Sequence, residues 1–111
     1  MSGMKGIVMH TVMWTFNMPQ KKTRDELRAI IAKSAPNYLN IDGLVRKYFG
    51  IAEDRQSIVG IYLWQSKEAA DQFYTTAWVE TVEERWGAAP TRMGWETPMV
   101  VESQEGRLIP A

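Results

Sequence analysis

His10 is the candidate catalytic acid or base of this 111-residue chain, which has one histidine and no cysteine. Imidazole has an ordinary pKa near neutral pH, so it can take a proton from a substrate and return it. The alternative is a buried histidine that only bonds a neighbouring hydroxyl or carbonyl. Its place in an apolar segment suits either role.

Aromatic and methionine side chains are the second chemical feature, with five Trp, four Tyr, three Phe and seven Met. Such side chains fill cores, and they also line apolar pockets and dimer interfaces. For any single ring, the packed core is the favoured interpretation. The rings that we predict as walls of a flat substrate pocket are those of Trp14, Tyr48, Tyr62, Trp64, Tyr74 and Trp78.

Two adjacent cations, Arg46 and Lys47, lie in one predicted strand, so their side chains point to opposite faces of a sheet. One is expected in solvent, and the other can stabilise an anionic substrate or pair with a carboxylate. We take Arg46 as the substrate-binding candidate.

The residue inventory also restricts the chemistry. One histidine cannot supply the two histidines of a non-haem iron triad, and no cysteine is present to hold a metal. Neither a Gly-x-Gly-x-x-Gly motif nor a P-loop occurs. We therefore expect no metal and no cofactor. An axial haem ligand is the remaining alternative for His10, without other support in the sequence.

Charge and hydropathy argue against two classes of partner. Basic and acidic residues balance at 13 each, without the basic excess of a nucleic-acid binder. No apolar run reaches the length of a membrane span, and the first residues lack a signal-peptide pattern. The expected location is the cytoplasm.

The elements that position these residues follow from hydrophobic periodicity. Strands are predicted over 7–16, 44–52, 58–64 and 93–102. Helices are predicted after the caps Thr23, Ser66 and Thr75, the first with a capping box to Glu26. Pro98 predicts an edge position or a break in the last strand. We expect one domain over 1–102 and a polar tail over 103–111.

This β-α-β-β-α-β order predicts an α+β, ferredoxin-like domain with a four-stranded antiparallel sheet and both helices on one face. The first strand is apolar on both sides, so something must cover each side. Residue parity alone leaves open which side faces the helices, and the family resemblance described below favours the even-numbered side, with His10, for the helices and any pocket. The odd-numbered side, with Met9 and Met13, is assigned to a second copy of the chain, because an open apolar face is unusual in a monomer.

Several segments resemble the YdhR-like family of monooxygenases, namely 43–49 (GLVRKYF), 60–70 (GIYLWQSKEAA), Phe73-Tyr74, Trp78, Trp86-Gly87 and Pro90. The resemblance implies a dimeric α+β barrel. This group includes antibiotic-biosynthesis monooxygenases that oxidise aromatic polyketides without metal or flavin. Residues 9–14 (MHTVMW) also resemble the first strand of the stress-responsive α/β-barrel group, where a histidine can face the pocket, as in a plant polyketide cyclase.

The leading hypothesis is a homodimeric, cofactor-independent monooxygenase that acts on a small aromatic or polyketide-like molecule between sheet and helices. Such chemistry needs a substrate that can itself give an electron to O₂, a base, and a site that excludes water. One alternative is a polyketide cyclase or isomerase with His10 as its base. The other is a non-catalytic, ligand-binding or stress-related dimeric barrel protein.

Overall fold

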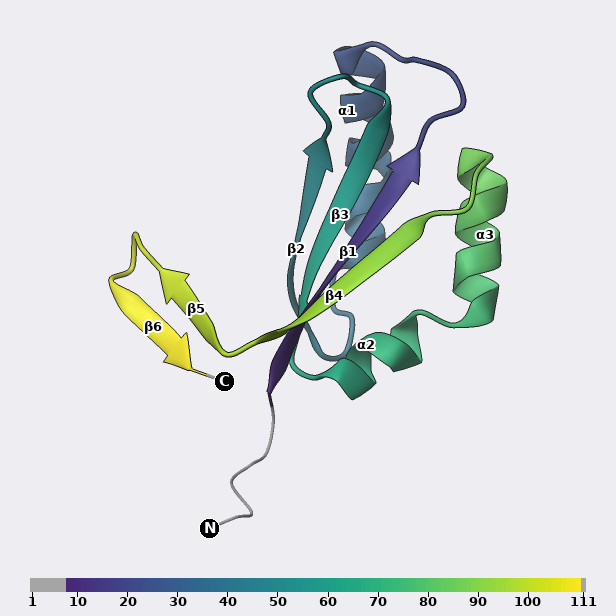
Figure 1. The fold of residues 1–111 in the computed structure, drawn as a ribbon. Helices are drawn as coiled ribbons and strands as arrows, with labels where there is room; N and C mark the ends of the chain where they lie inside the picture. Colours follow the sequence, from purple (N-terminus) through teal and green to yellow (C-terminus); the bar gives the residue numbers. More distant parts are fainter. Residues whose placement is uncertain (1–7, 111) are drawn as a thin grey trace.

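The computed structural model describes residues 8–110. The elements follow the predicted order and end in an additional hairpin (Figure 1). They are β1 (Met9–Asn17), α1 (Arg24–Ser34), the 3₁₀ helix η2 (Ala35–Tyr38), β2 (Leu44–Ile51), β3 (Ser57–Trp64), α2 (Lys67–Phe73), α3 (Thr76–Trp86), β4 (Thr91–Thr97), β5 (Met99–Glu102) and β6 (Arg107–Pro110). The predicted start of the first strand, residue 7, lies outside the described residues.

The main sheet has four antiparallel strands in the order β2-β3-β1-β4. This is the predicted ferredoxin-like α+β arrangement, which is confirmed. Figure 1 shows α1 behind the sheet and α3 beside β1 and β4. None of the helices in the described part of the chain is long and apolar enough to cross a membrane.

Local side-chain chemistry sets the helix starts as predicted. The Thr23 backbone N–H donates to the Glu26 carboxylate at 2.8 Å, and the Glu26 backbone N–H donates to the Thr23 hydroxyl at 3.1 Å. The hydroxyls of Ser66 and Thr75 cap α2 and α3 in the same sense. These bonds satisfy amides that the first helical turn leaves without partners, so the capping prediction is confirmed.

The even-numbered side of β1 carries the core. Val12, Trp14 and Phe16 are buried there, and the α1 residue Leu27 and the α3 residue Val82 pack onto the same cluster. The assignment of this side to the helices is therefore confirmed.

The opposite side of the sheet is covered by no helix among residues 8–110, and we call it the open face. One row across the four strands consists of Tyr48, Ile61, Met13 and Met93, and the next row contains Trp95. Tyr48 is 56% exposed, Met93 54% and Trp95 45%. An uncovered apolar face was predicted, and the described residues contain one.

The chain after β4 differs from the expected polar tail. The predicted last strand is interrupted at Pro98, which lacks the N–H that a ladder needs, and β5 and β6 then pair as an antiparallel hairpin. Gly106, with φ of 64°, lies in its turn. Figure 1 shows this hairpin projecting from the main sheet. The Arg46 guanidinium anchors it with two bonds of 2.8 Å to the Glu102 carboxylate.

Candidate functional site

Five of the predicted pocket rings form a packed cluster on the helix face. Trp78 lies 5.1 Å from Trp14 and 5.0 Å from Tyr74 between ring centroids, and Tyr62 lies 5.3 Å from Tyr74. The Trp64 indole N–H donates to the Tyr74 hydroxyl at 3.0 Å. Tyr62 and Trp64 are fully buried. These rings fill one another's space, which is the arrangement of a core.

The other two predicted substrate-binding residues lie on the open face. Tyr48 is exposed there, and Arg46 is committed to Glu102. Hydrogen bonding to that carboxylate raises the pKa of Arg46, and hydrogen bonding to Arg46 lowers the pKa of Glu102. The structure therefore separates these two residues from the aromatic cluster by the thickness of the sheet.

His10 is half-buried on the helix face, at the end of the sheet near α2. Its Nε2 lies 3.0 Å from the point that a Cβ at Gly94 would occupy, so Gly94 leaves room for the imidazole. A hollow of about 580 Å³, which we call the His10 recess, opens here. Its lining comprises Val8, Met9, His10, Gln65, Ser66, Lys67, Glu68 and Glu96.

The His10 recess suits proton transfer with small polar molecules. Two carboxylates and an ammonium share its wall with the imidazole. A haem needs apolar walls on both sides of the porphyrin, so these residues do not fit one. Among residues 8–110, no group of three His, Cys, Asp or Glu side chains lies close enough to hold a metal ion.

Lys47 occupies a different part of the helix face and was not among the predicted site residues. Its Nζ lies 3.2 Å from the ring centroid of Tyr38, 3.9 Å from that of Phe49 and 4.3 Å from that of Tyr62. Burial lowers the pKa of Lys47 to about 7. No carboxylate within residues 8–110 pairs with it. Lys47 is thus an amine that is enclosed by aromatic rings and that gains or loses its proton near neutral pH.

Gly60 makes this placement of Lys47 possible. A Cβ at residue 60 would lie 3.0 Å from the Tyr62 ring and 3.3 Å from Cε of Lys47. The Tyr62 hydroxyl lies 3.5 Å from the same point, is buried, and has no hydrogen-bond partner among the described residues. Two polar groups that have no side-chain partner within residues 8–110 thus lie over one glycine, and burial raises the pKa of Tyr62.

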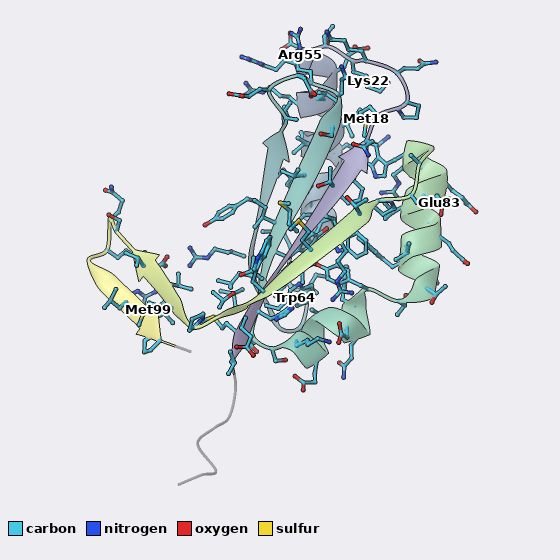
Figure 2. All side chains as sticks on the ribbon, in the orientation of Figure 1. Met18, Lys22, Arg55, Trp64, Glu83 and Met99 are labelled. Carbon is cyan, nitrogen blue, oxygen red and sulfur yellow. The ribbon has the colours of Figure 1, made fainter. Side chains whose placement is uncertain are left out.

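Three adjoining hollows, which we call the α1–α3 cleft, lead from the surface to Lys47. All three are bordered by Ile30, Arg85 and Trp86. The two outer hollows measure about 470 and 510 Å³, whereas the inner one, which reaches Lys47, measures about 20 Å³. The inner hollow has room for about one small polar group. Figure 2 shows Met18 and Lys22, at one end of the cleft, far along the sheet from Trp64.

The cleft could be foreseen only in part. Lys47 alternates with the apolar residues Phe49 and Ile51, which indicates the buried side of β2, whereas Arg46 alternates with Tyr48. That signal was available in the sequence. The meeting of Ile30 on α1 with Trp86 on α3 depends on how two helices lie on the sheet, which local periodicity does not report.

Comparisons by sequence find neither a family model nor a curated protein that matches this chain. Solved structures do match. The monooxygenase from the gene ActVA-Orf6 of Streptomyces coelicolor, solved in complex with nanaomycin D, has a TM-score of 0.59 at 15% identity, over 81% of this chain and 88% of that chain. SnoaB, a cofactor-independent oxygenase from Streptomyces nogalater, has a TM-score of 0.60 at 16% identity, over 86% and 99%.

A third similar structure is protein SO0527 from Shewanella oneidensis, with a TM-score of 0.62 at 14% identity, over 83% of this chain and 95% of that chain. At such identities, the similarity shows the fold alone. The chain therefore shares an α+β, ferredoxin-like fold with these solved structures.

Proposed function

We propose that this protein is a cofactor-independent monooxygenase of the YdhR-like kind, which oxidises a small aromatic or polyketide-like substrate in the α1–α3 cleft. The observation that carries the proposal is the cleft itself, which has apolar and basic walls and ends at an amine with a pKa of about 7. A fold shared with a cofactor-independent oxygenase supports it.

The reaction requires little from the protein besides a base and a dry site. A phenol or enol gives its proton to the neutral Lys47 amine, and the resulting anion passes electrons to O₂. When O₂ oxidises a CH₂ group to a carbonyl, one oxygen atom enters the product and the other leaves as water. The substrate supplies all four electrons that reduce O₂, so no external reductant is needed. Because the amine must be neutral to accept a proton, the rate is expected to rise as the pH increases through about 7.

Lys47 is better placed for this role than His10, because the His10 recess is polar and lies at the other end of the helix face. Oxygen uptake with a hydroxylated anthrone tests the proposal. We expect Lys47→Met to lower kcat by about 100-fold or more, the usual effect of losing a positioned base, and His10→Ala to lower it by less than about threefold. A large loss in His10→Ala alone would move the base to the recess. Absence of uptake across a panel of phenols and anthrones would contradict the function.

A second candidate function is supported by the His10 recess. His10 with Glu96 and Glu68 in one wall is suited to a cyclase or isomerase that moves protons without oxygen. Turnover of a poly-β-ketone substrate under nitrogen, abolished by His10→Ala and retained by Lys47→Met, is the result that this alternative requires.

The proposed functional unit is a homodimer formed through the open face. Tyr48, Met93 and Trp95 are roughly half exposed on one side of the sheet, and pairing with a second copy buries them. Light scattering of the purified protein measures the assembly directly. We expect a dimer for the wild type and a shift to monomer for Met93→Lys, in which a charge lies in the middle of the paired faces. A monomeric wild type at micromolar concentration would contradict the pairing.

A further inference from the structure

The charged residues that border the α1–α3 cleft all have the same sign. Its three hollows are lined by Lys22, Lys33, Arg85 and Lys47, and by no aspartate or glutamate of residues 8–110. A neighbouring hollow of about 340 Å³, at the β2 edge, also reaches Lys47 without an acidic wall residue. The chain as a whole has 13 basic and 13 acidic residues, so this concentration of positive charge is local.

Enclosure by rings compensates the Lys47 ammonium only in part. Ring faces attract a cation, but they carry no net charge, and the low-dielectric surroundings still penalise a lone ammonium. The charged and titratable groups that face Lys47 are Tyr38 from η2, Tyr62 from β3 and Arg85 from α3. A phenol neutral at physiological pH or a guanidinium cannot balance the charge. A negative group at this position can.

We propose that the α1–α3 cleft binds an amphipathic organic anion, whose carboxylate or phenolate oxygen contacts the Lys47 ammonium while its apolar body lies on Ile30, Trp86 and Met18. The inner hollow has room for the anionic group alone, and the outer hollows have room for a fused aromatic body. The expectation that the ligand has an aromatic body rests on the proposed function, whereas the expectation that it is negatively charged rests on the basic lining of the cleft.

Binding of such an anion is linked to the ionisation of Lys47. The bound anion favours the ammonium and raises its pKa above the value of about 7 in the free protein. Affinity is therefore highest below pH 7. It falls as the pH rises between the free and the bound pKa, by up to about tenfold per pH unit. Burial raises the pKa of Tyr62, so its hydroxyl stays protonated over this interval.

The experiment compares 2-naphthoate with 2-naphthamide, which has nearly the same shape and no charge, by isothermal titration calorimetry under nitrogen. At pH 6.5 we expect the anion to bind about tenfold more tightly or better, the size of one charged hydrogen bond. Lys47→Met abolishes that preference and leaves the affinity for the amide within about twofold. Lys21→Met, which removes an exposed lysine outside the lining, changes neither affinity.

Several results would contradict anion binding at Lys47. Equal affinities for acid and amide in the wild type, or a Lys47→Met variant that keeps the preference, overturns the proposal. If Lys47→Met does not fold, the exposed Arg85→Gln variant serves instead, with an expected loss of about threefold for naphthoate alone. A wild-type affinity for naphthoate that does not fall between pH 6.5 and 9 also overturns it. The calorimetric titration contains no oxygen, so it tests anion binding independently of oxidation. If naphthoate binds tightly but the separate assay detects no oxygen uptake, the proposed oxygenase function is wrong and the anion site is retained.

Discussion

Two aromatic regions lie on the same face of the same sheet and differ in what their rings enclose. Around Trp64, the rings contact one another, and the indole N–H has its partner in the Tyr74 hydroxyl. Around Lys47, the rings of Tyr38 and Phe49 surround an amine, and a hollow reaches it from the surface. The first region is closely packed, and the buried Trp14 indole N–H is a donor there without a hydrogen-bond partner among the described residues. The second leaves a charge and the Tyr62 hydroxyl without partners, which is costly for stability and useful for binding.

The largest loss of stability is expected when a ring is removed from the packed region around Trp64. Trp64→Ala leaves a cavity beside Tyr62 and Phe73, and we expect it to cost about 3–5 kcal/mol of unfolding free energy. Urea unfolding followed by circular dichroism measures the loss. Leu39→Ala, at a side chain that is 70% exposed, serves as the control and is expected to change stability by less than about 0.5 kcal/mol. A loss below about 1 kcal/mol for Trp64→Ala would mean that the cluster is not packed as described.

A smaller effect is expected where the two regions meet, at Gly60. The methyl group of Gly60→Ala would enter the space 3.0 Å from the Tyr62 ring and 3.3 Å from Lys47, so one of them must move. We expect a cost of about 1–3 kcal/mol, the usual range for overpacking. The preference for naphthoate over naphthamide is expected to fall as well. Unchanged stability together with unchanged binding would show that Lys47 does not need the space over residue 60.

The pH dependence of stability separates the two regions without removing a ring. Burial lowers the pKa of Lys47 in the folded protein to about 7, below the ordinary value of 10.5. Between these values the unfolded chain binds more protons, so this lysine's contribution makes the protein more stable as the pH rises from 7 towards 10. Thermal unfolding of the wild type and Lys47→Met over this interval tests the sign. The difference in Tm between them is expected to move in favour of the wild type, and a constant difference would contradict a lowered pKa.

The smallest effect is expected on the other side of the sheet, where one ion pair anchors the terminal hairpin. Glu102→Gln removes the charge that holds both guanidinium nitrogens of Arg46. We expect faster amide hydrogen exchange in β5 and β6 with no change in β1 and β3, because exposed and half-exposed pairs add little to global stability. Glu105→Gln, whose carboxylate pairs with Arg107 within the hairpin, is the matched control. Equal exchange in both variants would assign the anchoring to other contacts.

Much of the fold could be predicted, because its signals are local. The capping box at Thr23 and the alternation along β1 each identify an element within a few residues, and Pro98 marks the break after β4. The hairpin was missed because Glu102 and the polar turn after it have the composition of a solvated tail. Pairing of β5 with β6 depends on a turn in which Gly106 has a positive φ, and composition does not reveal that angle.

The candidate site could be predicted less well. Trp64 and Tyr74 were identified as chemically notable rings, and the structure places them in a packed cluster, since rings of this size mostly pack against one another when they are brought together. Lys47 was overlooked in favour of its neighbour Arg46, because charge and type do not distinguish them. What distinguishes them is which side of β2 faces the helices, and the alternation of Lys47 with Phe49 and Ile51 was the sequence signal for that side.

The contact over Gly60 also has an evolutionary consequence. Residues 47 and 60 lie on neighbouring strands, and the space that one leaves is the space that the other uses. Substitutions at these two positions are therefore not independent. In descendants of this chain, a side chain gained at 60 is expected to accompany a shorter residue at 47. Lineages that keep the amine at 47 are expected to retain the glycine at 60. The residues at these two positions therefore distinguish relatives that share the chemistry of the cleft from relatives that share only the fold of the chain.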